Sequence, residues 1–365
     1  MSPTITRSPA DASAPALSGP PYLSPEVHDD RRVTFRIPAP NAGEVTLNAD
    51  WLPSEKPKLT KGDKGIWSVT VGALPPGVYI YSFNIDGVAM PDALNPDIKL
   101  RARTTGSMVT VSGPEPGFWE YRDVPHGTVE INWHRSSALG ATRAVHVYLP
   151  PGYGKSGGKK YPVVYLLHGR TGTSADWTQV GFANFILDNL IAEKKTVPMI
   201  LVMPWAHALA FDATLPDNND ALEKYLLVDL IPFIEAKYRV LANRQNRALV
   251  GPSMGGAAAL TTGLGHLDRF SQIASFSAGT ASAPASEIDK RIAPALTKPK
   301  ATNKELKLLW IACGQRDPLL GLNQALSKSL TEHHIKHTFE ATAEGVHNFA
   351  LWRDYLHRTA PLLFK

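Results

Sequence analysis

The chain of 365 residues is 43% hydrophobic and 19% charged, a composition typical of globular proteins, and its length gives room for two domains. Its formal net charge is +5, but the basic residues are scattered rather than clustered, so the charge indicates no nucleic-acid-binding surface. No apolar run approaches the roughly 18 residues that a membrane-spanning helix needs, which argues against a membrane protein.

The N-terminal segment is rich in proline. Six prolines fall within residues 1–25, with Ser, Ala and Thr between them. Such a segment cannot bury enough apolar surface to offset its loss of conformational entropy, so we predict a flexible arm over residues 1–25. No basic stretch followed by an apolar one opens the chain, and the sequence therefore predicts no signal peptide.

Residues 26–113 have the pattern of a small β-sandwich. Gly- and Pro-rich turns separate short runs in which polar and apolar residues alternate. These runs are Arg32–Ile37, Glu44–Leu47, Trp67–Val71 and Val78–Phe83. Trp67 falls within such a run and is expected in the core, whereas Trp51, at the end of a strand, is the better candidate for stacking on a sugar. We predict a linker over residues 114–124, which open with Pro and Gly.

The segment 125–365 alternates apolar strands with amphipathic helices. The predicted strands are Val129–His134, Arg143–Leu149, Pro162–Leu167, Met199–Met203, Arg247–Val250, Leu306–Ala312 and His337–Glu340. The predicted helices are Phe182–Glu193, Ala221–Tyr238 and Phe349–Thr359. This alternation predicts an α/β fold, whose mostly parallel sheet is covered by helices on both faces. The single cysteine, Cys313, excludes an intramolecular disulfide and is expected to be buried at a strand end.

A motif for nucleophilic catalysis lies between a predicted strand and a helix. Residues Gly251–Gly255 read Gly-Pro-Ser-Met-Gly and match the G-x-S-x-G pattern, with a run of small residues after them. In a nucleophile elbow the glycines let the backbone turn sharply, which holds the serine hydroxyl clear of the sheet. The sequence therefore predicts that Ser253 is a catalytic nucleophile.

A serine hydroxyl needs a base to take its proton, and the base needs an acid to orient it. Asp317 directly follows the strand Leu306–Ala312, and His347 lies between the last predicted strand and the last helix. Both positions are loops at carboxyl ends of strands, and the order Ser, Asp, His is the one that α/β-hydrolases use. We therefore predict Asp317 as the acid and His347 as the base.

Hydrolysis of an ester also requires N–H donors for the oxyanion of the tetrahedral intermediate. The expected donors are the backbone N–H of Met254, just after the nucleophile, and that of Arg170, in the loop after the strand ending at Leu167. Trp177, Trp205 and His207 fall in loops over the same edge of the sheet and are candidates for contacts with the substrate.

Neither a metal ion nor another cofactor is predicted. Three histidines lie close in sequence at His333, His334 and His337. No set of carboxylates is arranged around them, so this pattern does not indicate a metal site. An acyl-transfer reaction through a serine needs no cofactor.

The segment from Val124 to Lys365 resembles carbohydrate esterase family 1, the feruloyl and acetyl xylan esterases, which are similar to esterase D. The residues that carry this resemblance are Val124–Val129, Tyr148–Tyr153, Tyr165–Gly169, Gly255-Gly256, Cys313–Asp317 and Trp352–Leu356. The front region is similar to the immunoglobulin-like family 48 carbohydrate-binding module through Val33–Arg36, Ala39–Ala42, Gly65–Val69 and Pro76–Tyr79.

The resemblance implies a serine esterase acting on feruloyl or acetyl esters of plant polysaccharide, and it implies a secreted or periplasmic location. Pro252, Trp205 and Phe349 differ from the residues that the family often carries there, and these differences bear on the shape of the acyl pocket. Three alternatives stay open: a small-acyl esterase such as an acetyl xylan esterase, a siderophore trilactone esterase, and a glycan-binding protein with an inactive hydrolase domain. The sequence does not determine the oligomeric state.

Overall fold

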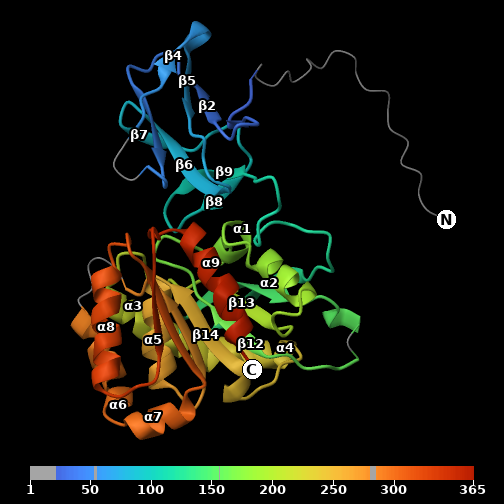
Figure 1. Cartoon of the computed structure of the whole chain (residues 1–365), viewed down its shortest axis with the longest axis vertical. Coiled ribbons are helices and arrows are strands. Elements are labelled where there is room, and N and C mark those ends of the chain that lie inside the picture. Colours follow the sequence, from blue (N-terminus) through green and yellow to red (C-terminus); the bar gives the residue numbers. More distant parts are fainter. Residues whose placement is uncertain (1–21, 53–55, 156, 280–284) are drawn as a thin grey trace, which may run out of the picture.

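The computed structural model describes residues 22–365 except 53–55, 156 and 280–284. A smaller all-β part lies against one end of a larger α/β part (Figure 1). The predicted arm over residues 1–25 lies almost entirely outside the described residues. The all-β part ends with a strand at Val111 and the sheet of the larger part begins at Thr128, while the domain boundaries drawn from the sequence stay predictions.

The all-β part consists of two antiparallel sheets, as the alternating pattern predicts. The first sheet contains β1 (Glu26–Val27), β2 (Val33–Pro38), β5 (Ile66–Val71) and β4 (Thr60–Lys61), in this order. The second contains β3 (Val45–Ala49), β6 (Gly77–Ile85), β9 (Thr105–Val111) and β8 (Ile98–Leu100), with β7 (Val88–Met90) beside β6. Alternate residues of these strands face inward and form one core, which includes Val33, Phe35, Val45, Leu47, Phe83 and Val109.

Both tryptophans singled out in this part contact the sandwich core. Trp67 is buried, and its indole N–H donates to the carbonyl of Ala39 at 2.9 Å. Trp51 is half-buried, and its ring stacks on Phe35 and meets Tyr79 edge-on. A role for Trp51 in stacking on a sugar therefore stays a prediction.

The larger part is built on one eight-stranded sheet. Its strands, in order across the sheet, are β10 (Thr128–Ser136), β11 (Ala141–Leu149), β13 (Ile200–Pro204), β12 (Val163–Leu166), β14 (Arg247–Pro252), β15 (Gln272–Phe276), β16 (Leu308–Gly314) and β17 (Thr338–Thr342). The pairs β10–β11 and β11–β13 are antiparallel, and the other pairs are parallel. The predicted α/β class with a mostly parallel sheet is thus confirmed.

Helices cover both faces of this sheet. One face packs against α2 (Ala183–Ala192) and α9 (Phe349–Thr359). The other packs against α3 (Leu215–Tyr225), α4 (Ile231–Lys237), α5 (Met254–Gly265), α6 (Ala285–Leu296) and α8 (Leu320–Glu332). Two shorter helices, α1 (Asp176–Gln179) and α7 (Pro299–Glu305), lie in the connections.

The helix predicted over Ala221–Tyr238 needs correction. It begins earlier, at Leu215, where the Thr214 hydroxyl accepts from the backbone N–H of Asp217 at 3.2 Å and caps the helix. It is also interrupted by a π-helical turn, η3 (Leu226–Leu230), just before Pro232. Proline has no N–H to donate to the preceding turn, and the wider turn fits this gap in the hydrogen-bond ladder.

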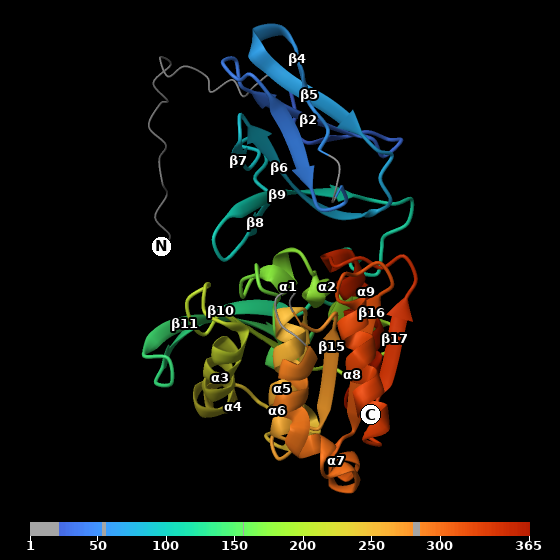
Figure 2. The same ribbon diagram turned by 90° about the vertical axis from the view of Figure 1, so that its left-hand side faces the viewer.

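The carboxyl ends of the parallel strands face the β-sandwich (Figure 2). The segment between the two parts is fixed in place, because the side-chain amide of Asn189 donates to the carbonyls of Phe118 and Glu120, both at 3.0 Å. Trp119, in the same segment, is buried in the core of the larger part. The sandwich therefore lies over the loops that follow the parallel strands of the larger part.

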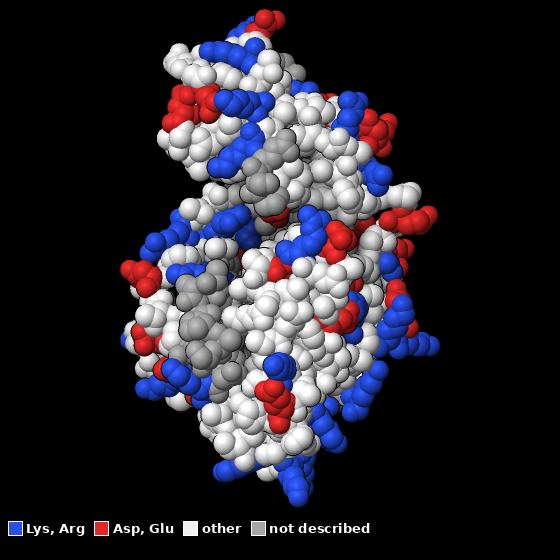
Figure 3. All heavy atoms as spheres, turned by 60° about the vertical axis from the view of Figure 1, so that its left-hand side comes forward, with Lys and Arg blue, Asp and Glu red and all other residues white. Residues whose placement is uncertain are grey.

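Charge is distributed over the visible surface rather than gathered into one patch. Lys and Arg alternate with Asp and Glu on the face drawn in Figure 3, and several basic side chains border the hollow between the two parts. Within the described ranges, no helix has both the length and the apolar character needed to cross a membrane. The same ranges contain no group of three or more His, Cys, Asp or Glu side chains placed to hold a metal ion.

Candidate active site

Ser253 sits on a sharp turn between β14 and α5. Its backbone has φ +54° and ψ −122°, a conformation that residues with a side chain rarely adopt. The turn is possible because its neighbours are glycines: a Cβ on Gly251 would lie 2.7 Å from the backbone of Gly255, and one on Gly255 would lie 2.6 Å from the carbonyl of His168. This is the backbone of a nucleophile elbow, at the position that the sequence pattern predicts.

The side chains of Ser253, His347 and Asp317 lie in one hydrogen-bonded row. The Ser253 hydroxyl is 3.0 Å from Nε2 of His347, and Nδ1 of His347 is 2.8 Å from Oδ2 of Asp317. Since the Asp317 carboxylate can only accept, Nδ1 of His347 carries the proton and Nε2 is left free to accept from the serine. The three residues that the sequence places far apart are brought together in the order that general-base catalysis requires.

Asp317 is the least exposed residue of this row. Asp317 is buried, and its Oδ1 accepts from the backbone N–H of Leu319 at 2.8 Å. Burial alone would raise the pKa of Asp317, but the hydrogen bond and charge of His347 outweigh this effect and hold that pKa below its usual value. The carboxylate therefore stays ionised at neutral pH and can orient the imidazole.

One close approach of the backbone and one contact between rings support the loop that carries His347. A Cβ on Gly314 would lie only 2.1 Å from the carbonyl oxygen of Gly345, so the loops that carry Asp317 and His347 touch at a position where only glycine fits. The ring of Trp352 in α9 meets the imidazole of His347 edge-on, with centroids 5.0 Å apart.

The loop over residues 168–173 is held by two histidines. Nε2 of His168 accepts from the backbone N–H of Ala206 at 2.8 Å, so the proton is on its Nδ1, which donates to the carbonyl of Gly169 at 2.7 Å. Burial lowers the pKa of His168 to about 4, which keeps the ring neutral in this role. Nε2 of His207, also buried, donates to the carbonyl of Arg170.

Of the two backbone N–H groups predicted for the oxyanion, that of Arg170 lies in this loop and that of Met254 directly follows Ser253. Within the described residues, the N–H of Met254, at the start of α5, and the N–H of Arg170 have no hydrogen-bond partner. Unpaired N–H groups beside a nucleophile are the donors that an oxyanion hole requires. Their role in this protein stays a prediction.

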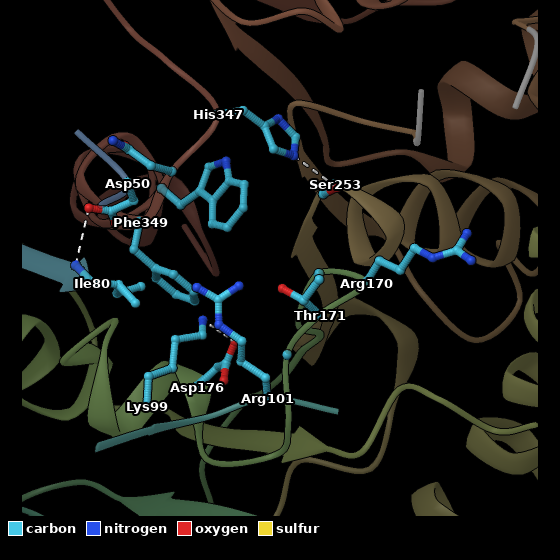
Figure 4. Close-up of a pocket in the computed structure, with 14 residues that line it drawn as sticks. Asp50, Ile80, Lys99, Arg101, Arg170, Thr171, Asp176, Ser253, His347 and Phe349 are labelled. Carbon is cyan, nitrogen blue, oxygen red and sulfur yellow. Dashed lines mark hydrogen bonds and ion pairs between the residues drawn. The ribbon is translucent and has the colours of Figure 1, made fainter. Parts of the chain in front are cut away.

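A cavity of about 270 Å³ opens beside Ser253 between the two parts of the molecule (Figure 4). Its walls combine apolar side chains with charged ones, and both parts contribute. From the larger part they include Arg170, Thr171, Asp176, Asn348, Phe349 and Trp352. From the sandwich come Asp50, Ile80, Lys99 and Arg101.

The residues of the sandwich in this cavity were not predicted from the sequence. One signal could have drawn attention to them: Lys99, Arg101 and Arg103 alternate with apolar residues, which would place three cations on one side of an extended segment. Which surface that side faces depends on how the two parts dock, and local sequence does not encode it.

The predicted substrate contacts are placed at different depths. Trp177 in α1 is only 1% exposed, and its indole N–H donates to the carbonyl of Leu167 at 2.7 Å. It meets the ring of Phe349 edge-on at 5.5 Å, so it supports the cavity wall from behind rather than facing the cavity. Trp205 is half-buried just after β13. His207 donates to the carbonyl of Arg170.

Asp50 gives a prediction on the pH dependence of stability. Burial raises the pKa of Asp50 to about 6, although the backbone N–H of Ile80 and the charge of Arg101 oppose the shift. The folded state then binds the proton more tightly than the unfolded chain, so this group's contribution to the free energy of unfolding falls as the pH rises from about 4 to about 6. We expect Asp50→Asn to raise the free energy of unfolding by about 1–3 kcal/mol at pH 7.5 and to have no effect at pH 3.5.

This expectation can be checked with urea unfolding curves at the two pH values. Asp63→Asn, at an exposed position of the same sandwich, serves as the control and should change neither curve. If Asp50→Asn raised the free energy of unfolding equally at both pH values, the effect would not come from protonation of Asp50.

Comparison with known proteins places this geometry among esterases. A family model described as a putative esterase matches residues 136–363. An endo-1,4-beta-xylanase/feruloyl esterase of Xylanibacter ruminicola is 29% identical over 356 residues, which cover 96% of this chain and 47% of that protein. An esterase of Mycobacterium tuberculosis is 33% identical over 169 residues, 45% of this chain and 32% of that protein. The chain thus spans less than half the length of these curated relatives.

Solved structures agree with the fold. A ferulic acid esterase superposes with a TM-score of 0.56 and 26% identity, covering 65% of this chain and 97% of that one. The enterobactin esterase of Shigella flexneri superposes with a TM-score of 0.64 and covers 90% of this chain and 92% of that one. With 18% identity, this second likeness concerns the fold alone, but it extends over both the sandwich and the α/β part.

Proposed function

The chain belongs to the putative esterase family, and from this premise we propose that it is a serine carboxylic-ester hydrolase that works through an acyl-enzyme. The observation that carries the proposal is the row formed by Ser253, His347 and Asp317, with its distances of 3.0 and 2.8 Å. These lie within the range in which a base can take a proton from a nucleophile.

The proposed reaction follows from this row. Ser253 Oγ attacks the ester carbonyl while Nε2 of His347 takes its proton, and the Asp317 carboxylate stabilises the imidazolium that forms. The negative oxygen of the tetrahedral intermediate is bound by the N–H groups of Met254 and Arg170. His347 then gives its proton to the departing alcohol, and the acyl group remains on Ser253.

Water completes the cycle by the same route. His347 takes a proton from a water molecule that attacks the acyl-enzyme, and it returns this proton to Ser253 as the acid leaves. No cofactor is required at any step.

We propose hydroxycinnamoyl esters of plant polysaccharide, of which feruloyl esters are the main example, as the substrate class. The relative that supports this is the xylanase/feruloyl esterase, whose similarity covers 96% of this chain. The cavity beside Ser253 adds support, since Phe349, Trp352 and Ile80 give it apolar walls suited to a flat aromatic group.

A siderophore trilactone such as enterobactin is the second candidate. Two observations favour it: the likeness of fold to the enterobactin esterase covers both parts of the chain, and Arg101 brings positive charge to the cavity. A small acyl group such as acetate remains the third possibility.

The experiment that tests the proposal compares kcat/KM for methyl ferulate, p-nitrophenyl acetate and enterobactin. We expect methyl ferulate to be the best substrate. In a rapidly quenched reaction, a peptide containing Ser253 should also carry the mass of a feruloyl group.

Each other outcome has a definite meaning. Activity on the acetate alone would keep the mechanism and change the substrate to small acyl esters. A clear preference for enterobactin would favour the trilactone. No hydrolysis of any of the three would refute the esterase proposal and favour a glycan-binding protein.

A further inference from the structure

Strand β8 of the sandwich exposes its apolar residues and buries its charged residue. Its two apolar residues, Ile98 and Leu100, are 38% and 47% exposed, whereas Lys99 between them is only 4% exposed. Burying a lysine while exposing its apolar neighbours is unfavourable unless the charge has a partner. The inward-facing side of this strand is directed at the α/β part, so the reason for the pattern lies at the contact between the two parts.

The partner of Lys99 is a carboxylate of the α/β part. Its Nζ lies 3.0 Å from Oδ2 of Asp176, and the side chains are 5% and 3% exposed. Its ammonium group also lies 4.7 Å from the centre of the Phe349 ring (Figure 4). Lys99 therefore contacts both an anchor of the loop that carries Arg170 and the residue two positions after His347.

Asp176 links Lys99 to the loop over residues 168–173. Its Oδ1 accepts from the backbone N–H of Thr173 at 3.2 Å. The loop approaches the same carboxylate so closely that a Cβ on Gly172 would lie 2.4 Å from Oδ2. The position of the loop thus depends on where the Asp176 carboxylate is held.

The sandwich holds this loop at a second point. The backbone N–H of Ala102, just after β8, donates to the carbonyl of Thr171 at 3.0 Å. Thr171 is adjacent to Arg170, whose N–H is the proposed second donor to the oxyanion. The α/β part also holds the loop, through His168 and His207, so both parts of the molecule fix its position.

From this geometry we propose that Lys99 is a positioning residue for ester hydrolysis, which acts through Asp176 to hold the loop that carries the N–H of Arg170. The inference rests on the proposed function for its effect on catalysis. Through Lys99, the sandwich would contribute to the geometry of the active site. Because a misplacement of about 1 Å in an active site can cost about 100-fold in rate, a loosened loop should slow the chemical step more than it weakens binding.

The test is Lys99→Met in the full chain, which keeps an unbranched side chain of similar length and removes the charge. With p-nitrophenyl acetate, we expect kcat to fall roughly 10–100-fold with KM changed less than about threefold. Lys99→Arg, which can still pair with Asp176, should restore most of kcat. Lys58→Met, at an exposed position of the same sandwich, is the control and should match the wild type.

Asp176→Asn tests the same link from its other end and also serves if Lys99→Met does not fold. It should lower kcat by a similar factor, and the double variant should be no slower than the slower single one, because both substitutions remove one interaction. Wild-type kcat in both single variants would overturn the proposal, and so would a rise in KM alone.

Hydrogen exchange of residues 168–176 gives a readout that does not depend on activity. We expect these amides to exchange faster in Lys99→Met than in the wild type, and at an unchanged rate in Lys58→Met. If the wild type hydrolyses no ester, the proposed function fails while this measurement still decides whether Lys99 holds the loop. Unchanged exchange together with unchanged kcat would refute the role of Lys99.

Discussion

Replacing Ser253 with alanine is expected to lower kcat on the best ester substrate by roughly 10⁴–10⁶-fold with the fold intact. The hydroxyl removed is the one placed 3.0 Å from Nε2 of His347. Without it the reaction can proceed only by direct attack of water, assisted by the remaining base and N–H donors. Alanine also lacks the oxygen on which an acyl group could form, so no acylated peptide should be detected.

A buried serine in the neighbouring strand provides a matched control for this variant. Ser275 in β15 is 0% exposed, and its hydroxyl has no hydrogen-bond partner among the described residues. Removing an unpaired buried hydroxyl should cost little stability, and Ser275→Ala should keep near wild-type kcat. Appreciable activity in Ser253→Ala with the same pH profile as the wild type would mean that another group is the nucleophile.

The row formed by Ser253, His347 and Asp317 could be predicted because each of its members follows a strongly patterned element. The apolar strand before Ser253 and the glycines around it identify a turn at the end of β14. Asp317 and His347 follow the next two predicted strands, and parallel strands bring their carboxyl ends to one edge of the sheet. The last helix, Phe349–Thr359, has the predicted bounds, because the Asn348 side chain caps its start and accepts from Leu351 at 3.2 Å.

The cavity could not be predicted in the same way, because its walls depend on docking between distant segments. Lys99 is 77 positions away from Asp176, and no periodicity relates the two. Trp177 illustrates another difficulty: it was predicted in a loop but lies in the short helix α1, and a local pattern does not tell a side chain that faces a cavity from one just behind its wall. Packing against Phe349 and the bond to Leu167 decide this, and both are tertiary contacts.

Asp317→Asn is expected to lower kcat by roughly 10³–10⁴-fold while leaving KM and thermal stability nearly unchanged. Asparagine has almost the same shape as aspartate, and its carbonyl oxygen can still accept from the backbone N–H of Leu319. Its amide nitrogen, however, would donate to Nδ1 of His347, which forces the imidazole proton onto Nε2. That tautomer cannot take the proton of Ser253, so the geometry would persist and the base would be lost.

The hydrogen bond and charge of His347 hold the pKa of Asp317 below its usual value, so in the wild type the aspartate is ionised at neutral pH. Asp354→Asn, which removes a carboxylate paired with Arg358 elsewhere on α9, should leave kcat unchanged. If Asp317→Asn lowered kcat by less than about tenfold, the tautomer argument would fail, and His347 would have to be oriented by another group.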